Sequence, residues 1–456
     1  MNFDKAIEAK LDEVVQSISR ICKINSVEDA PKKGMPFGEG PAKALECALE
    51  IGEELGFTTE NFENYVGHIN FGTEKQGIVG VLAHVDVVPA GEGWEHNPWG
   101  GEVSDGIIWG RGTMDDKGPI ITCVYAMKIL EESGLPLSKQ IRVILGTNEE
   151  TNWGCMDYYT KVVQPIMPDV AFSPDASFPV TYAEKGILQY KLETSFDGDA
   201  KIYGGNAFNA VPSIAFAEIY DINQQDITQA VEKIDTQCIF EIEKIENGVK
   251  IVSNGKGAHA ARLESGVNAI SGLMLLLGEL DLQGDLKKVI DFYNTHMGTT
   301  YYGEKMGIYK VDESGNLTFN VGKIEIADGK CVICCDNRIP VTADINETID
   351  IIKAKIEVSE FEYVELCADA PLYIAKDSPL VTTLMEAYKD VTGDKDAVAI
   401  TAGGGTYSRT VDNCVAFGCR LPYQANTIHQ ANEHLKIEDV KMWLKIYTEA
   451  LYRLAK

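Results

Sequence analysis

The sequence predicts an α/β protein whose mixed, mainly parallel sheet is flanked by helices, with an α+β domain inserted into the chain. The first observation is an alternation of strand-like and helix-like segments between residues 77 and 172, which is typical of a mainly parallel sheet. The second is a change near Glu184-Lys185-Gly186, after which β-like runs dominate, and the third is the return of the first pattern from Ser378. We therefore expect one domain of residues 1–186 plus 370–456 and an inserted domain of residues 187–369.

In the first domain the expected strands are short apolar runs, and the expected helices carry apolar residues at intervals of three and four. The run from 77 to 89 is bounded by Gly and Pro and is nearly continuous in apolar residues, as expected of a strand buried on both faces. Similar runs lie at 141–145 and 170–172. Helices are expected at 3–22, 41–55, 117–132, 380–391 and 437–454.

In the inserted domain, β-like runs at 188–193, 249–253, 317–326 and 330–335 are interleaved with helical patterns at 213–219 and 269–279. The run Cys331-Val-Ile-Cys334-Cys335 contains a CxxC, which is a weak signal for a metal or redox site. No second CxxC accompanies it in the sequence, so we expect these residues to be buried cysteines of a strand.

Composition and charge exclude several classes of protein. With 456 residues the chain is long enough for two or more cores, and none of its apolar runs approaches the ~20 residues that span a bilayer. The net charge of −28 argues against a nucleic-acid-binding protein, which needs a clustered basic surface. The first residues show no basic segment followed by an apolar one, and the 11 cysteines suit a reducing compartment. We expect a cytoplasmic protein that binds neither membrane nor nucleic acid.

Polar residues that suit metal binding follow the apolar runs of the first domain. They are His84 and Asp86, Asp115 and Asp116, Glu149 and Glu150, Asp175, and His429. Catalytic and ligand groups in open α/β sheets gather at the carboxyl ends of the strands, and histidines with carboxylates form a nitrogen and oxygen donor set for zinc, manganese or cobalt.

Each of these residues alone also has an ordinary explanation. A histidine beside an aspartate is also typical of a buried structural pair, and adjacent acids such as Glu149 and Glu150 are common in solvated turns. Asp115 and Asp116 would suit the start of a helix, and a single histidine such as His429 is commonly structural or exposed. Their joint placement after successive strands favours the metal site.

The motifs resemble the cocatalytic metallopeptidases, a family that includes dipeptidase V, carnosinase-like dipeptidases, aminoacylases and glutamate-releasing carboxypeptidases. The matching stretches are His84-Val-Asp86, Gly110-Arg-Gly-Thr-Met-Asp115-Asp116-Lys-Gly, Thr147-Asn-Glu149-Glu150-Thr, Ser173-Pro-Asp175-Ala and His429-Gln-Ala-Asn-Glu433. They occur in the family's order, and the stretches at 89–94 and 146–153 are most similar to the dipeptidase V branch. The resemblance implies a phosphorylase/hydrolase-like catalytic domain with an inserted lid domain.

The resemblance also implies two divalent metal ions bridged by Asp115. It assigns His84 and Asp175 to one ion, and Glu150 and His429 to the other. Two such ions carry +4, three ligand carboxylates carry −3, and a bridging hydroxide brings the centre to neutrality. Zn²⁺ is the expected metal, with Mn²⁺ or Co²⁺ as alternatives because oxygen-rich sites accept the metal that is available.

Two further acids of the centre receive roles from the same resemblance. Asp86 would orient His84, and Glu149 would act as the general base that takes a proton from the metal-bridging water and passes it to the leaving amine. The peptide bond between Asp115 and Asp116 is often cis in this family, and we expect the same here.

The inserted domain would contribute substrate-binding residues. His259 resembles the histidine that relatives bring over the active site to stabilise the oxyanion, and Asn209 and Arg338 resemble substrate-binding positions. An arginine can hold a substrate carboxylate with two hydrogen bonds, and the backbone of Gly404 could bind the same group. A structural histidine, a strand-end ion pair and a plain tight turn remain alternatives for His259, Arg338 and Gly404. A lid histidine supplied by the same chain is consistent with a monomer.

The resulting functional prediction is metal-dependent hydrolysis of dipeptides and short peptides that carry a free C-terminal carboxylate. A deacylase or amidohydrolase acting on N-acyl amino acids is the alternative within the same family, because the motifs are shared. A catalytically inactive homologue would be expected to lack the base or a ligand, yet every matched position is filled.

Overall fold

The computed structural model describes residues 3–73, 76–357 and 359–456. The chain divides into two compact units. The first comprises Met1–Tyr182, Ile374–Ile400 and Thr406–Lys456, and the second comprises Ala183–Tyr373 and Thr401–Gly405. The first unit is therefore assembled from three separate stretches of the chain.

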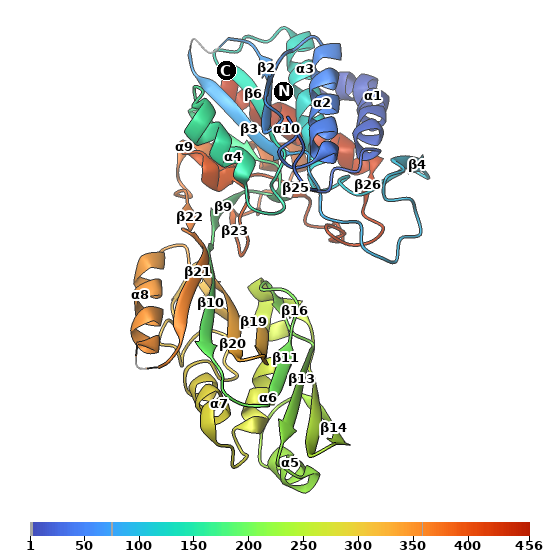
Figure 1. Cartoon of the computed structure of the whole chain (residues 1–456). Helices are drawn as coiled ribbons and strands as arrows, with labels where there is room; N and C mark the ends of the chain where they lie inside the picture. Colours follow the sequence, from blue (N-terminus) through green and yellow to red (C-terminus); the bar gives the residue numbers. More distant parts are fainter. Residues whose placement is uncertain (1–2, 74–75, 358) are drawn as a thin grey trace. The chain divides into compact units, whose positions relative to one another are not determined.

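The first unit is built on a mixed sheet whose central strands are parallel (Figure 1). Its strands include, in spatial order, β1 (Thr58–Phe62), β2 (Val66–Phe71), β6 (Gln140–Gly146), β3 (Ile78–His84), β7 (Val170–Ser173), β24 (Cys414–Ala416) and β9 (Thr181–Glu184), and β9 also pairs with β22 (Leu372–Tyr373) and β23 (Ile400–Ala402). Strand β3 pairs in parallel with β6 and β7, and β7 pairs in parallel with β24. Outside this parallel core, β1 runs antiparallel to β2, β2 to β6, and β9 to β24. Consequently β3, β6 and β7 end at the same edge of the sheet.

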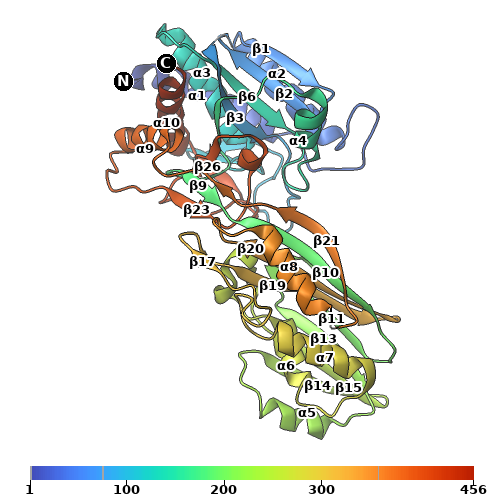
Figure 2. The same ribbon diagram turned by 90° about the vertical axis from the view of Figure 1, so that its left-hand side faces the viewer.

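Helices cover both faces of this sheet. They are α1 (Asp4–Cys22), α2 (Glu39–Glu54), α3 (Lys117–Ser133), α4 (Gly154–Tyr158), α9 (Pro379–Thr392) and α10 (Ile437–Ala455). Leu82 and Ile144 pack with Met156 and Tyr159 from the α4 side. Neighbouring side chains of a strand point to opposite faces, so the residues next to Leu82 in β3 and next to Ile144 in β6 point to the other face. Helices α3 and α10 cover that face, where they pack against each other and against β3. Helix α2 lies against β1 and β2 (Figure 2).

The local sequence explains where several of these helices begin and end. The side chain of Ser378 accepts a hydrogen bond from the backbone N–H of Val381, and Pro379 occupies the first turn of α9. Gly393 ends this helix in the left-handed conformation with φ 77°, as Gly134 ends α3 with φ 66°. Two short strands near the C-terminus, β25 (Cys419–Arg420) and β26 (His434–Lys436), flank the segment 421–433.

The second unit is an antiparallel sheet with helices packed on its core. The strand order is β14 (Ile239–Ile245), β15 (Gly248–Asn254), β13 (Ile214–Tyr220), β11 (Lys201–Gly204), β19 (Thr318–Ala327), β20 (Lys330–Ile339), β10 (Gly186–Ser195) and β21 (Glu362–Asp369). Residues of α5 (Gln224–Val231), α6 (Ala269–Leu277), α7 (Gly284–His296) and α8 (Ile345–Ile356) join the buried cluster of this sheet.

The predicted fold class is therefore confirmed, whereas the helix expected at 213–219 is wrong. Residues Ile214–Tyr220 form strand β13, in which Ala215, Ala217 and Ile219 are buried and their neighbours are more exposed. This period of two is the strand pattern, although the two alanines by themselves favour a helix. The cysteines of the CxxC lie buried in β20. Within the described residues, none of the helices combines the length and the apolar character that crossing a membrane requires.

Candidate metal centre

Side chains from separate segments of the first unit converge at the carboxyl edge of its sheet. His84 is the last residue of β3, and Asp175 follows the end of β7 by two residues. Asp115 lies two residues before α3 begins. Glu150 belongs to the turn after β6, and His429 lies in the segment between β25 and β26. The peptide bond between Asp115 and Asp116 is cis, as expected from the sequence.

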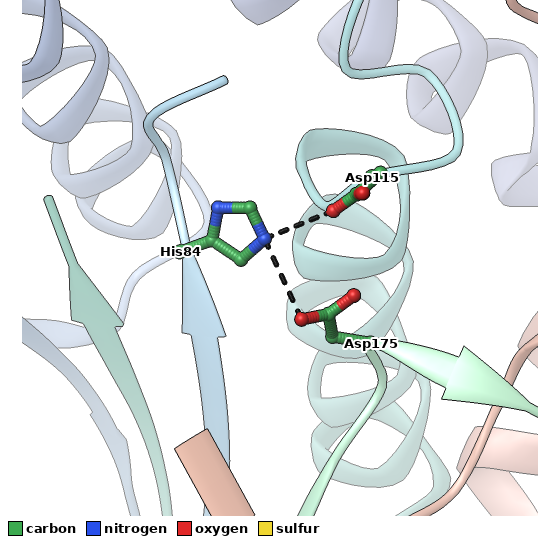
Figure 3. Close-up of side chains that lie close together, drawn as sticks. All are labelled: His84, Asp115 and Asp175. Carbon is green, nitrogen blue, oxygen red and sulfur yellow. Dashed lines mark hydrogen bonds and ion pairs between the residues drawn. The ribbon is translucent and has the colours of Figure 1, made fainter. Parts of the chain in front are cut away.

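One group of possible ligands consists of His84, Asp115 and Asp175 (Figure 3). The Nε2 atom of His84 lies 3.0 Å from Oδ1 of Asp115 and 3.7 Å from Oδ2 of Asp175. In Figure 3 the carboxylates of Asp115 and Asp175 both point toward this nitrogen of His84. One ligand atom of each residue lies within 4.8 Å of the others, so one cation could touch all three.

A second group consists of Asp115, Glu150 and His429 and meets the same distance limit. The Nε2 atom of His429 lies 2.9 Å from Oδ2 of Asp115 and 3.1 Å from Oε2 of Glu150. Asp115 thus directs Oδ1 to the first group and Oδ2 to the second. A carboxylate shared in this way is the geometry that a bridge between two cations requires. Among the described residues, no other histidine, cysteine or acidic cluster meets this criterion.

The charges of the centre favour bound cations. Burial, followed by repulsion from Asp115, raises the pKa of Glu150, and the same two causes raise the pKa of Asp175 well above its usual value. Burial alone would raise the pKa of Asp115 as well, but hydrogen bonds from His429 and His84 outweigh it and lower that pKa. Divalent cations would neutralise these crowded carboxylates, and the donor set of two histidines and three carboxylates fits zinc, manganese or cobalt.

The surrounding carboxylates favour the protonated forms of both histidines. Burial by itself would lower the pKa of His84, but its hydrogen bonds to Asp115 and Asp86 raise that pKa well above 6.5. For His429 burial is likewise outweighed by Asp115 and Glu150, and the pKa rises to about 11. A histidine must lose this proton before it can bind a metal, so cations would replace protons in the same positions.

Asp86 organises the centre more extensively than the sequence suggested. Its buried carboxylate lies 3.5 Å from Nδ1 of His84, whose ring also lies 3.0 Å from the Asp86 carbonyl oxygen. With Nδ1 as the donor to this carbonyl, Nε2 is left to bind a metal. The same carboxylate accepts hydrogen bonds from the backbone N–H groups of Glu149, at 3.0 Å, and Glu150, at 3.1 Å. Asp86 therefore positions the proposed base and a ligand of the second group.

Glu149 lies beside Glu150 but belongs to neither ligand group. Burial raises its pKa well above the usual value, and the charges of Glu150, Asp115 and Asp86 act in the same direction. Glu149 thus lies within electrostatic range of these three carboxylates. This is the environment expected of a carboxylate that exchanges protons during catalysis.

Two predicted substrate residues of the second unit lie side by side. Asn209 immediately precedes the short strand β12 (Ala210–Val211), and His259 ends β16 (Ala258–His259). These strands pair antiparallel with Ala210 opposite His259, and the backbone oxygen of Asn209 accepts a hydrogen bond from the N–H of Ala260. Both side chains are exposed.

The segment that carries Asn209 is held by a residue that the sequence did not single out. The buried side-chain amide of Asn320 donates to the carbonyl oxygens of Phe208, at 2.8 Å, and Ala210, at 2.9 Å. The segment also passes so close to Gly322 that a Cβ there would lie 2.3 Å from the Phe208 oxygen. Asn320 and Gly322 fall in β19, and nothing in their sequence spacing indicates this contact.

Arg338 and the glycines near Gly404 also meet within the second unit. Arg338 is buried, and it donates from Nη1 to the carbonyl oxygen of Gly403 at 3.3 Å. It is also ion-paired, because Nε and Nη2 lie 2.9 and 3.2 Å from the two carboxylate oxygens of Asp336. The strand-end ion pair foreseen as an alternative for Arg338 therefore exists, and a role in substrate binding would use the Nη1 side.

A mixed β-sheet flanked by helices, with two linked groups of possible metal ligands at its carboxyl edge, indicates a metal-binding protein of the α/β class. Residues 80–453 match Peptidase family M20/M25/M40. The chain belongs to this family and is a hydrolase of peptide bonds. The family is metal-dependent, in keeping with the two ligand groups.

Full-length relatives support this assignment. YtjP of Bacillus subtilis (strain 168), which is provisionally named a dipeptidase, is 36% identical over 470 residues that cover 100% of both chains. Beta-Ala-Xaa dipeptidase of Lactobacillus delbrueckii subsp. lactis is 34% identical over 475 residues, which cover 100% of this chain and 99% of the relative.

Solved structures show the same fold. Human carnosine dipeptidase 1 matches with a TM-score of 0.59 and 14% identity, over 99% of this chain and 98% of that one. An M20 family metallo-carboxypeptidase from Sulfolobus solfataricus matches with a TM-score of 0.60 and 16% identity, over 97% of this chain and 99% of that one. At these identities the likeness concerns the fold alone.

Proposed function

We propose that this protein is a dinuclear metallodipeptidase that cleaves dipeptides and short peptides with a free C-terminal carboxylate. The observation that carries the proposal is Asp115, which directs one carboxylate oxygen to each of two ligand groups. The names of the two relatives, a provisional dipeptidase and a Beta-Ala-Xaa dipeptidase, support dipeptides as the substrate class.

In the proposed mechanism the two ligand groups would hold two divalent ions, which would acidify water and polarise the scissile carbonyl. Glu149 accepts a proton from the attacking water and then donates it to the leaving amine nitrogen, so that the base is regenerated as the C–N bond breaks. Asp86 keeps Glu149 in place through the hydrogen bond that it accepts from the backbone N–H of that residue. The buried, acid-rich surroundings of Glu149 support this role because they favour uptake of a proton.

Residues of the second unit are proposed to bind the substrate. The Nη1 side of Arg338 and the backbone at Gly404 would receive the C-terminal carboxylate, because a guanidinium and backbone N–H groups both bind that anion. His259 and Asn209 would bind the substrate carbonyl as negative charge develops on its oxygen. Their pairing through β12 and β16 supports a shared site, since each strand fixes the backbone of the other.

A substrate panel tests the proposal directly. The protein is first freed of metal, refilled with Zn²⁺, Mn²⁺ or Co²⁺, and assayed on dipeptides, blocked dipeptide amides and N-acetyl amino acids. We expect dipeptides with a free C-terminus to give the highest kcat/KM. Faster hydrolysis of N-acetyl amino acids than of any dipeptide would instead make the protein a deacylase of the same family.

Replacing His259 by Ala is expected to lower kcat about 10²- to 10³-fold, the usual loss for one oxyanion donor. Metal content should not change, because His259 belongs to neither ligand group. The measurement is steady-state kinetics with metal analysis, and His296→Ala, on α7 of the same unit, is the matched control. An unchanged kcat in His259→Ala would return this residue to a structural role.

A further inference from the structure

A buried ion pair joins two segments that carry ligands of the metal centre. Arg111 is 1% exposed and Glu433 is 0% exposed, and Nη1 of the arginine lies 2.5 Å from Oε2 of the glutamate. The two residues are 322 positions apart in the sequence. Neither belongs to a ligand group, and the mechanism above uses neither.

The carboxylate of Glu433 organises the loop that ends in Asp115. Its other oxygen, Oε1, accepts hydrogen bonds from the backbone N–H groups of Met114, at 2.8 Å, Gly112, at 3.1 Å, and Asp115 itself, at 3.3 Å. The backbone oxygen of Glu433 accepts another from the N–H of Gly110, at 3.0 Å. The loop is therefore wrapped around the side chain of Glu433. One of the backbone N–H groups that donate to this carboxylate belongs to Asp115, the residue shared by both ligand groups.

The pair also contacts the segments of two other ligands. Nη2 of Arg111 lies 3.3 Å from the carbonyl oxygen of Ala90 and 3.4 Å from that of Pro89, in the stretch that follows His84. Glu433 itself ends the stretch that begins at His429. One ion pair thus connects the chain segments that supply His84, Asp115 and His429.

The two ligand groups depend on this connection to different extents. His84 ends β3 and Asp175 lies two residues after β7, so the pairing of these strands fixes both residues independently of the ion pair. His429 instead lies in an irregular segment, with φ at 62° and a side chain that is 49% exposed. Four residues further along, Glu433 ties this segment to the Asp115 loop. Loss of the pair should therefore disturb the group of Glu150 and His429 more than the group of His84 and Asp175.

We propose that Arg111 and Glu433 are positioning residues that set the separation between Asp115 and His429 and so determine the metal affinity of the second ligand group. This proposal rests on the proposed function for the two metal ions. A buried ion pair is a weak source of stability compared with apolar packing, whereas a fixed geometry is a well-attested use of one. Positioning residues next to metal ligands change metal affinity about 10- to 100-fold when they are mutated.

The test compares metal binding by three metal-free proteins: the wild type, Glu433→Gln and Arg142→Lys. Binding is measured by calorimetric titration with Zn²⁺ and by the absorption spectrum of the Co²⁺-loaded protein. The Glu433→Gln substitution keeps the size of the side chain but removes the charge that faces Arg111. We expect one of the two binding steps to weaken about 10- to 100-fold, the other to stay within about threefold, and the Co²⁺ bands to shift. Arg111→Lys provides a second variant, with a smaller loss of the same step, if Glu433→Gln does not fold.

Arg142→Lys is the matched control because Arg142 is also buried and donates to Asn70 and Ile166, but near the start of β6, away from the centre. It should lower the melting temperature and leave both binding steps unchanged. Wild-type metal affinity in a folded Glu433→Gln protein would overturn the positioning role. So would an equal weakening of both metal-binding steps in Glu433→Gln and in Arg142→Lys. If the wild type cleaves N-acetyl amino acids and not dipeptides, the proposed function fails, while the affinity comparison still decides the role of the pair.

Discussion

Replacing Glu149 by Gln is expected to lower kcat on a dipeptide about 10²- to 10⁴-fold, the range associated with loss of a general base. Glutamine keeps the shape of the side chain but cannot accept the proton of the attacking water. The turn should stay in place, because Asp86 holds it through the backbone N–H groups of Glu149 and Glu150 and not through the Glu149 carboxylate. Steady-state kinetics and metal analysis of the same sample measure the two effects.

The neighbouring residue provides a matched control. The same substitution in Glu150→Gln removes a charged ligand from the second group, so we expect this variant to lose both metal and activity. Two adjacent glutamates should therefore respond differently to one chemical change. If Glu149→Gln loses a metal, or keeps a rate near that of the wild type, its assignment as the base is wrong.

Replacing Asp115 by Asn is expected to weaken metal binding at both ligand groups and to lower activity at least about 10³-fold. Asp115 is the residue that the two groups share, and its two oxygens lie 3.0 and 2.9 Å from the two histidine nitrogens. Metal ions supply several kcal/mol of transition-state stabilisation, and about 1.4 kcal/mol corresponds to a tenfold change in rate. Metal content after dialysis, together with kcat/KM, measures the outcome.

Asp175→Asn is the control for this variant, because Asp175 belongs to the first group alone. It should weaken the binding of one ion and leave the second group able to hold the other. Retention of two tightly bound ions by Asp115→Asn would show that Asp115 does not bridge them.

The fold and the ligand candidates were predictable because both rest on local patterns. Apolar runs such as the one that becomes β3 identify buried strands, and polar residues directly after them fall at one edge of a parallel sheet. His84 and Asp175 meet in space for this reason, whereas Asp115, in the loop before α3, was expected beside them from the family resemblance. The error at β13 arose where the local signal was ambiguous, since two alanines in seven residues suit a helix as well as a strand.

The supporting contacts could not be predicted, because they depend on how distant segments meet. The resemblance predicted that Asp86 orients His84, but the sequence could not reveal that Asp86 also accepts hydrogen bonds from the backbone N–H groups of Glu149 and Glu150. The contact of Arg111 with Glu433 spans 322 residues, and no periodicity connects them. Residues that hold the metal ligands in place can therefore be identified only from the three-dimensional structure, not from sequence patterns.

The most direct test of the central account is a titration of metal-free protein with Zn²⁺, Mn²⁺ or Co²⁺ that follows bound metal and dipeptide hydrolysis together. Two linked ligand groups predict two bound ions per chain, with hydrolysis reaching its maximum as the second ion binds. Saturation at one ion per chain, or full activity in the metal-free protein, would contradict it.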